Sequence, residues 1–192
     1  MPRPRKGSEE KGAEERMVEA FWSQLSRMPY REVTAASIAR QAGCNRATFY
    51  YYFESIEDLA EQAVGAAIPV GIADLAEKFL AGDGASFHLD RPQRLAVERV
   101  CLLTGPNGST RLTERFKRAL MDTWAGRFGL DLGQEDVQAV ASFMASGIVG
   151  ILGDQAGRPC DEHFDARLQA VSEVFSAPAI EFAHGRLHCE AR

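Results

Sequence analysis

The 192-residue sequence has few of the features that mark secreted, disulfide-linked or membrane-spanning proteins. Its four cysteines, Cys44, Cys101, Cys160 and Cys189, are scattered without the spacing of a disulfide framework. The first residues are charged and contain prolines in place of an apolar signal segment. The most apolar run, 137–153, contains polar residues and is shorter than the ~20 residues that cross a bilayer. We therefore expect a cytoplasmic protein with reduced thiols and no membrane partner.

Patterns that carry enzyme chemistry are also missing. No paired carboxylates, no nucleophile beside a base and no glycine-rich phosphate loop stand out. Two short stretches offer possible metal ligands, CDEH at 160–163 and HGRLHC at 184–189. Neither is a complete set of four ligands. The sequence therefore predicts no catalytic residues, no metal site and no cofactor.

Charge is present in quantity but is unevenly distributed. The formal net charge is −5, which argues against general binding of polyanions. Residues 1–60 hold nine Lys or Arg and nine Asp or Glu, so the excess of acid lies in the rest of the chain. Within 27–53, four arginines stand against the single acid Glu32. An anionic partner is therefore expected at the N-terminal end.

Helix signals dominate and convincing alternating strands are absent, so we predict an all-α fold of about nine helices. Met17, Phe21 and Leu25 recur four residues apart and form the apolar stripe of a first helix. Glycine-containing loops and Pro69 separate the later amphipathic segments. The predicted helices cover about 8–27, 35–42, 46–53, a segment after Ser55, and then 69–81, 91–104, 109–128, 134–154 and 161–176.

Capping residues define the helices between positions 34 and 58. Thr34 is a good N-cap for the helix that follows it, and Gly43 stands where a left-handed C-cap is needed. Asn45 can cap the next helix, and Ser55 with Asp58 forms a capping box for a fourth. The pattern is two short helices joined by a tight turn.

Five consecutive aromatic residues, FYYYF, occupy the second of these short helices. On a helix, Phe49 and Phe53 share one face and can pack against the preceding helices. Tyr50, Tyr51 and Tyr52 then cover the other faces, where their hydroxyls suit phosphate oxygens and their rings suit thymine methyl groups. The arrangement is typical of a helix-turn-helix.

The segment YREVTAASIARQAGCNRATFYYYFESIEDL resembles the DNA-binding domain of TetR-family transcriptional regulators. The resemblance covers about residues 14–62, and beyond it the chain is similar to the family only in length and helical layout. The matching positions are Thr34, Ile38, Ala39, Ala42, Gly43, Thr48, Phe49, Tyr50, Phe53, Ser55, Glu57 and Leu59.

The resemblance implies a recognition helix at 46–52 that enters the major groove of DNA. The residues it places at base edges are Arg46, Ala47, Thr48 and Tyr51. The residues it places at phosphates are Thr34, Tyr50 and Tyr52. Ile56 stands where many family members have a phosphate-binding lysine, and Arg27, Arg31 or the cations of the N-terminal arm are expected to substitute for it.

The resemblance also implies two domains, a DNA-binding domain at 1–62 and a ligand-binding and dimerisation domain at 63–192. The last two helices are expected to pair with those of a second copy across a two-fold axis. The residues expected in that dimer interface are Val140, Met144, Gly147, Ile148, Ile151, Leu168, Val171 and Phe175. The residues expected to line a pocket for a small, mainly hydrophobic ligand are Phe79, Cys101, Met121, Trp124, Phe128, Phe143 and Met144.

The function expected from these features is a homodimeric regulator, most simply a repressor, that a small-molecule effector releases from a palindromic operator in double-stranded DNA. One alternative is an activator, or a regulator controlled by a protein partner without a small ligand. Another is a helical enzyme or binding module with a vestigial helix-turn-helix.

Overall fold

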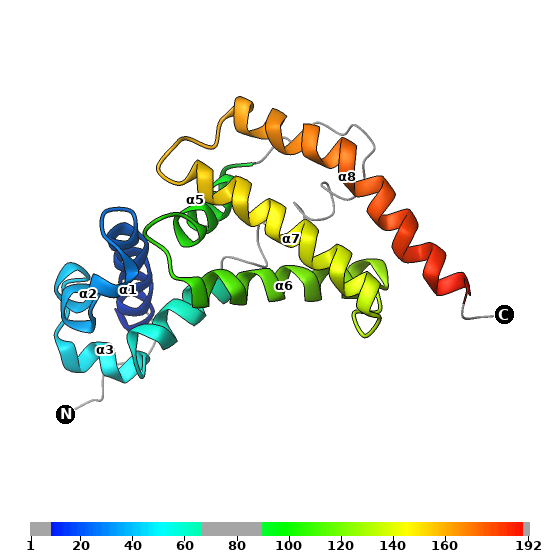
Figure 1. The fold of residues 1–192 in the computed structure, drawn as a ribbon. Helices are drawn as coiled ribbons and strands as arrows, with labels where there is room; N and C mark the ends of the chain where they lie inside the picture. Colours follow the sequence, from blue (N-terminus) through cyan, green and yellow to red (C-terminus); the bar gives the residue numbers. More distant parts are fainter. Residues whose placement is uncertain (1–8, 67–89, 190–192) are drawn as a thin grey trace.

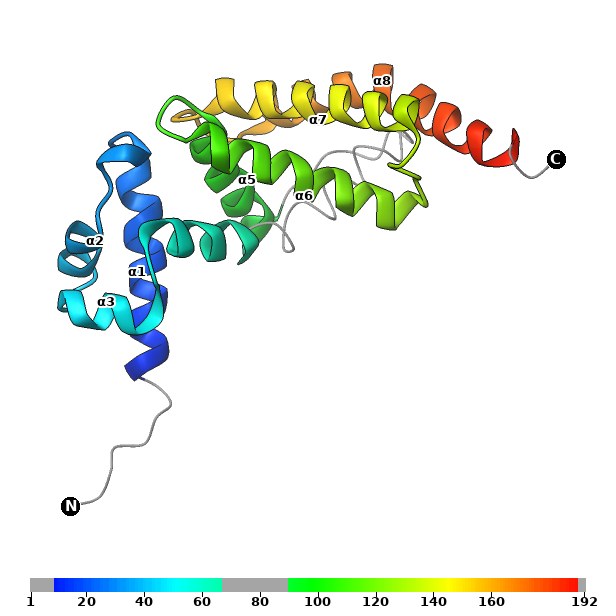
Figure 2. The same ribbon diagram turned by 60° about the horizontal axis from the view of Figure 1, so that its bottom comes forward.

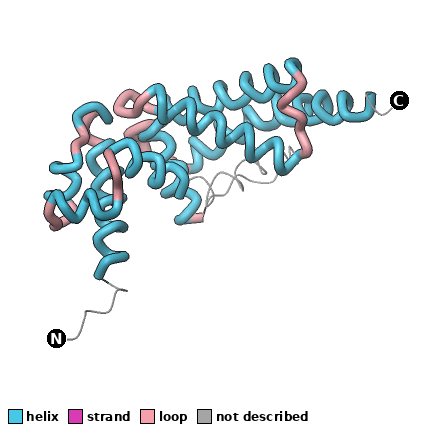
Figure 3. Tube along the Cα trace, turned by 90° about the horizontal axis from the view of Figure 1, so that it is seen from below, coloured by secondary structure: helices cyan, strands magenta, loops and turns pink. Residues whose placement is uncertain are grey.

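The computed structural model describes residues 9–66 and 90–189, and these residues form helices joined by turns and loops, with no strand among them (Figure 3). The expected all-α fold is confirmed for this part of the chain. The molecule is elongated, with the N-terminal helices at one end and the end of the last helix at the other (Figure 1). The helix predicted at 69–81 lies outside the described residues.

The N-terminal end is a small bundle built from short elements. Helix α1 spans Glu9–Leu25, a single 3-10 turn spans Tyr30–Glu32, and helices α2 and α3 span Ala35–Gln41 and Arg46–Tyr52. The apolar stripe predicted for α1 is confirmed, since Met17, Phe21 and Leu25 are all fully buried. Both short helices pack closely against a neighbour, α2 on α1 and α3 on α2.

Side-chain caps fix the ends of α2 and α3 as the sequence predicts. The Thr34 hydroxyl accepts a hydrogen bond from the Ser37 N–H at 3.2 Å, and the Asn45 side chain accepts one from the Thr48 N–H at 2.8 Å. Between the two helices Gly43 has φ of +68°, a left-handed conformation that costs glycine little. The chain therefore turns from α2 into α3 within a few residues.

Residues 56–66 form a further helix after α3. Its cap differs slightly from the predicted capping box, because the Ser55 hydroxyl accepts from the Asp58 N–H while the Asp58 carboxylate accepts from the N–H of Glu54, one residue earlier than predicted. Hydrogen bonds from Gln62 and from the Glu54 backbone lower the pKa of Asp58 below its ordinary value. The carboxylate therefore stays charged at this helix start.

Four longer helices form the C-terminal part. These are α5 at Arg91–Thr104, α6 at Thr110–Phe128, α7 at Glu135–Gln155 and α8 at Glu162–Cys189. Helix α7 packs on α5, α6 and α8 and is the central element of this bundle (Figure 2). One apolar core runs through both ends of the molecule, with large buried members in Phe21, Phe49, Phe116, Trp124 and Phe164.

Helix α7 corrects one statement drawn from the sequence. The apolar run at 137–153 is shorter than a membrane span, but the helix that forms has 21 residues and is long and apolar enough to cross a membrane by length and composition alone. A core helix of a globular protein passes the same test. Its packing against three neighbouring helices accounts for its apolar character.

Helix α8 is longer than predicted. The sequence suggested an end near 176, before Pro178, but the helix continues through this proline to Cys189. A proline inside a helix removes one backbone hydrogen bond and strains the preceding turn without always ending the helix. Neighbouring alanines at 177, 179 and 183 favour continuation, since alanine has the highest helix propensity.

Candidate nucleic-acid interface

Helix α3 has one buried face and one exposed face. Phe49 is fully buried in the core, and Phe53 directly after the helix is 1% exposed. On the other faces Tyr50 is 48% exposed and Tyr51 62% exposed. Arg46 and Ala47 are exposed at the start of the helix. The helix is therefore anchored by its phenylalanines and presents polar and aromatic groups to solvent.

Two of the exposed side chains hold each other in place. The Arg46 guanidinium donates a hydrogen bond to the Tyr50 hydroxyl at 3.1 Å and lies 5.4 Å from the centre of its ring. The two residues are one helical turn apart, so the pair forms along a single face. Because the tyrosine oxygen only accepts from Arg46, its own O–H stays available to donate to an anion.

The other predicted contact residues surround this pair. Thr48 is half-buried and its hydroxyl donates to the Asn45 cap at 3.1 Å. Tyr52 is also half-buried, with its ring edge-on to Tyr51 at 4.9 Å between centres. Tyr52 therefore presents less of its surface to a partner than its two neighbours do.

A groove of about 600 Å³ separates α3 from the start of α2. Thr34, Arg46 and Tyr50 all line it, so residues predicted to bind phosphates and bases border one depression. Arg31 and Ile56 line it too. An arginine therefore lies in the same groove as the isoleucine that replaces the expected lysine, and the substitution of Arg31 for that cation stays a prediction.

The floor and rim of this groove are not uniformly basic. Glu54 and Glu57 also line it, beside Arg31 and Arg46. Burial, together with the nearby charge of Glu57, raises the pKa of the Tyr30 phenol to about 12. Tyr30 therefore stays neutral, and its buried hydroxyl has no hydrogen-bond partner.

A buried polar network holds α2 against α1 behind the interface. The Ser37 hydroxyl donates to the Gln24 amide oxygen at 2.7 Å, and the Gln24 amide nitrogen donates to Gln41 at 2.9 Å. Gln24 is only 5% exposed, so both of its polar atoms are satisfied inside the protein. Ser37 also completes the capping box of Thr34, so the network holds Thr34 in place beside the groove.

A model of the bacterial regulatory proteins of the TetR family matches residues 18–63, which include the whole of the helix-turn-helix. This part of the chain is a DNA-binding domain of the TetR-family type. No curated protein matches it. Its fold is similar to that of the fatty acid degradation regulator FadR from Bacillus halodurans, with a TM-score of 0.50 and 13% identity over 90% of this chain and 96% of that chain.

Two further solved structures have lower TM-scores. One is the TetR-family repressor AlkX from Dietzia sp. strain DQ12-45-1b, with a TM-score of 0.42, 19% identity, and coverage of 94% of this chain and 99% of that chain. The other is Salmonella enterica GusR, with a TM-score of 0.47, 17% identity, and coverage of 85% and 94%. The TetR-family match and the helix-turn-helix geometry together identify a DNA-binding regulator.

The residues predicted to line a ligand pocket separate into groups. Cys101, Trp124 and Met144 are buried, and Met121 and Phe128 are partly buried against the same core. Phe143 differs from them, because it is 67% exposed and its ring meets that of Phe175 on the surface. Phe79 lies outside the described residues.

The residues predicted for the dimer interface also separate into groups. Three of its residues, Met144, Ile148 and Leu168, face the core of their own chain. Gly147 and Phe175 are exposed, and the remaining three are partly buried: Val140, Ile151 and Val171. The sequence could not separate these groups because α7 is apolar on two faces, and only the neighbours chosen in the fold decide which face is covered.

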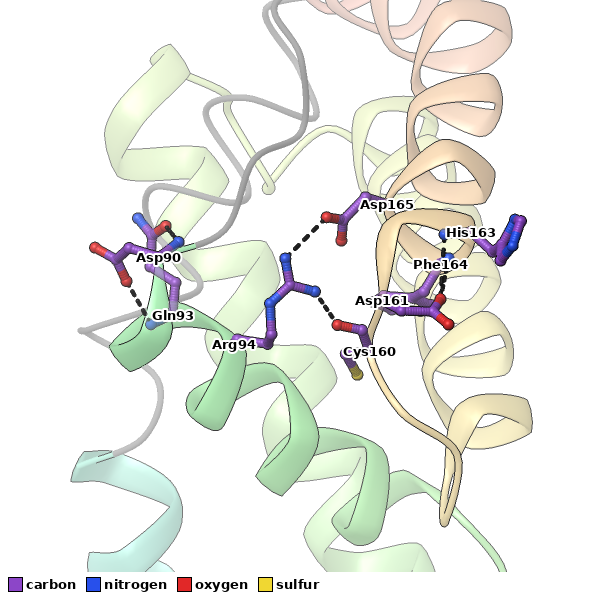
Figure 4. Close-up of polar contacts among 8 residues, drawn as sticks. All are labelled: Asp90, Gln93, Arg94, Cys160, Asp161, His163, Phe164 and Asp165. Atoms are coloured by element: carbon purple, nitrogen blue, oxygen red, sulfur yellow. Dashed lines mark hydrogen bonds and ion pairs between the residues drawn. The ribbon is translucent and has the colours of Figure 1, made fainter.

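Of the two possible metal motifs, only CDEH at 160–163 has described side chains, and these do not converge. Cys160 points its sulfur toward α5 while His163 points away from it (Figure 4), and His163 is exposed. The side chains of 184–188 lie outside the described part of the structure. Across residues 9–66 and 90–189, no group of three or more His, Cys, Asp or Glu side chains is placed to hold a metal ion.

No pattern in the sequence indicates the residues that connect the interface to the C-terminal bundle. The Asn107 side chain donates to the Leu25 carbonyl at 3.0 Å, and the Asn107 carbonyl accepts from the Tyr30 N–H at 2.7 Å. Glu61 pairs with Arg111 and Arg115 of α6 at 3.2 Å and 2.8 Å. These contacts join residues far apart in sequence, so no local pattern could reveal them.

Proposed function

We propose that the chain is a homodimeric repressor that binds a palindromic operator and is released by a small, mainly hydrophobic effector. The observation that carries this proposal is the exposed face of α3, where the preformed Arg46–Tyr50 pair lies on a helix anchored by Phe49. An exposed arginine suits guanine edges, and a free tyrosine O–H suits a phosphate oxygen.

The roles within the interface follow from position. Arg46, Ala47, Thr48 and Tyr51 contact base edges in the major groove. Tyr50, Tyr52 and Thr34 contact phosphates and set the register of the helix, and Arg31 supplies the cation that Ile56 does not. The boundary between domains is placed near residue 62, although the helix at 56–66 runs through it.

The dimer forms through the surfaces of α7 and α8 that the single chain leaves uncovered. Phe143, Phe175 and Val174 are large apolar side chains exposed there, and Phe143 and Phe175 already touch. Gly147 lies on the same exposed side of α7 and allows a partner helix to approach. Pairing these helices across a two-fold axis places the two recognition helices about 34 Å apart, which is the distance between adjacent half-sites.

The effector binds within the C-terminal bundle, where Trp124 has a buried indole N–H without a hydrogen-bond partner. A ligand with one hydrogen-bond acceptor on an apolar body would satisfy that group. Binding then favours a dimer whose recognition helices no longer match successive major grooves.

The experiment that tests the proposal is a selection from sheared genomic DNA of the source at about physiological salt, where non-specific binding is weak. The purified chain is expected to enrich a two-fold-symmetric site. Tyr50→Ala is expected to weaken binding to all sequences, whereas Arg46→Ala also relaxes base preference by ~1–3 kcal/mol at one position.

Arg118→Ala serves as the matched control, since Arg118 is an exposed cation on α6 away from the groove. It should bind like the wild type. Equal binding by the wild type, Tyr50→Ala and Arg46→Ala would show that α3 is not the reading helix. A screen for compounds that raise the melting temperature and dissociate the selected DNA then tests the effector.

A further inference from the structure

We propose that Asn107 is a positioning residue for DNA binding, which fixes the angle between α1 and the rest of the helix-turn-helix and thereby sets the half-site spacing that the dimer accepts. Asn107 lies in the loop between α5 and α6, yet its side chain and its backbone both bond the segment that joins α1 to the 3-10 turn. The inference rests on the proposed function, because it assigns a role in operator binding.

The segment between α1 and the 3-10 turn contains two backbone groups that lack a local partner. In a continuing helix the Leu25 carbonyl would accept a hydrogen bond from the N–H of residue 29. That residue is Pro29, which has no N–H. The N–H of Tyr30 opens the 3-10 turn and so has no acceptor within it. A partner from elsewhere in the fold therefore stabilises each group, since an unpaired buried backbone group costs free energy.

Asn107 supplies both partners. Its side-chain amide donates to the Leu25 carbonyl at 3.0 Å, and its backbone carbonyl accepts from the Tyr30 N–H at 2.7 Å. We call these two hydrogen bonds the Asn107 clamp. Because one residue makes both bonds, α1 and the 3-10 turn cannot change their relative angle without weakening one of them. The loop that carries the clamp lies beside α1 in Figure 1.

The loop itself is held tightly, so Asn107 is presented at a fixed place. The Gly108 N–H donates to the Gly105 carbonyl at 3.0 Å and closes a β-turn around Asn107. An added Cβ at Gly108 would lie 1.7 Å from the Leu103 carbonyl oxygen, and one at Gly105 would lie 2.3 Å from the Cβ of Ala156. The turn is therefore packed against the ends of α5 and α7 without space for a side chain at either glycine.

The clamp acts on residues of the proposed DNA interface. The Val33 N–H donates to the Tyr30 carbonyl at 3.0 Å, and the next residue, Thr34, is the N-cap of α2. Tyr30, Arg31 and Thr34 all line the groove beside α3. Phosphate contacts set the register and orientation of a protein on the duplex, whereas base contacts read the sequence. Loss of the clamp should therefore disturb half-site spacing and leave base preference intact.

Asn107→Ala removes the side-chain half of the clamp and keeps the backbone half. Its affinity for the operator that the wild type selects should fall by about 2- to 10-fold, the factor that corresponds to one net hydrogen bond. Its preference for the selected half-site spacing over a spacing one base pair longer or shorter should shrink. Base preference within each half-site should match the wild type. A purely structural role would lower the melting temperature without changing the spacing preference of the folded protein.

Asp131→Ala is the matched control. The Asp131 carboxylate accepts from the Gly133 N–H at 2.9 Å in the turn between α6 and α7, so this variant also loses one side-chain bond to the backbone of a turn. That turn lies at the end of α6 away from α1 (Figure 1). The control should keep the affinity and the spacing preference of the wild type. Equal losses of affinity in the two variants, or an unchanged spacing preference in folded Asn107→Ala, would overturn the proposal.

A measurement on the wild-type chain decides the matter if Asn107→Ala does not fold. Amide hydrogen exchange at Tyr30 should be slow, because the Asn107 carbonyl holds its N–H. Exchange as fast as in an unfolded peptide would show that the clamp does not form and would overturn the proposal. A wild-type chain that selects no two-fold-symmetric DNA would instead refute the proposed function. With slow exchange at Tyr30, that result would reduce the clamp to a structural contact and remove its role in DNA binding.

Discussion

Different residues of α3 contribute to folding and to the exposed surface proposed for recognition. Phe49 is fully buried, whereas Tyr51, two positions later, is 62% exposed. The two aromatic rings are similar in size but belong to different environments. Their substitution should therefore have opposite consequences, which makes them a matched pair for experiment.

Phe49→Ala is expected to destabilise the chain by ~3–5 kcal/mol, because it removes a large side chain from a packed core and leaves a cavity. Tyr51→Ala should change the free energy of unfolding by less than ~0.5 kcal/mol, as surface changes usually do. Urea unfolding measures both changes in stability. Operator binding measures the separate loss of affinity that we expect for Tyr51→Ala. A Tyr51→Ala variant that is stable and binds DNA normally would remove Tyr51 from the interface.

Residues whose roles are set by their own neighbours in sequence were predictable. Thr34, Gly43 and Asn45 act as the sequence indicates, because capping and left-handed turns depend on a few adjacent positions. The Arg46–Tyr50 contact also lies within one helical turn. The hydrogen bond between Asn107 and Leu25 could not be predicted, because it depends on how the loop after α5 meets the end of α1.

At the scale of whole elements, the short helices depend on their caps. Helix α3 has seven residues, too few to be stable alone, and its start is fixed by Asn45. Helix α2 is equally short and depends on Thr34 and Ser37. The position of the recognition helix is thus determined by side-chain hydrogen bonds at its first turn and by Phe49 beneath it.

Asn45→Ala is expected to destabilise the chain by ~1 kcal/mol, because the Thr48 N–H loses its acceptor at the helix start. Asn45→Asp is the control, since a carboxylate caps as well as an amide oxygen. Both are measured by urea unfolding without DNA. Equal losses for the two variants would mean that the cap hydrogen bond is not what holds α3.

Element lengths were less predictable than element types. The existence of the helices followed from periodicity, but the continuation of α8 through Pro178 did not, because a proline normally signals an end. The covered face of α7 was also unpredictable. Its residues are apolar on both sides, so Met144 and Ile148 looked equivalent to Phe143 until the neighbouring helices were in place.

At the scale of the whole molecule, three sets of contacts join the N-terminal bundle to the rest. Asn107 bonds Leu25 and Tyr30, Glu61 pairs with α6, and Arg99 meets α1. Beyond this joint, the exposed apolar side of α7 and α8 remains without a partner in the single chain. The joint lies on α5, α6 and the loop between them, whereas the uncovered side lies on α7 and α8. Helix α7 packs against both α5 and α6, so the proposed dimer surface and the helix-turn-helix are connected through α7.

Gly147→Ala provides a test of the dimer. In the single chain an added methyl at Gly147 meets nothing within 4 Å, so it should stabilise the helix by up to ~1 kcal/mol. If a partner helix packs there, the same methyl should weaken dimerisation by ~1–3 kcal/mol through overpacking. Sedimentation equilibrium measures the dimer, and urea unfolding of dilute protein measures the chain.

Gly126→Ala on α6 is the control, because Gly126 is also exposed and also has space for a methyl group. It should stabilise the chain without changing dimerisation. Identical dimer affinities for the two variants would place the partner elsewhere on the surface.

The single buried position on α3 also bears on how such a regulator evolves. Apart from Phe49, the side chains of this helix are exposed or half-exposed, and the caps that hold it lie outside its base-reading positions. Arg46, Ala47 and Tyr51 can therefore be exchanged with little penalty to folding. A lineage can therefore change the DNA sequence that it reads through a handful of surface substitutions while the buried core of the fold is inherited intact.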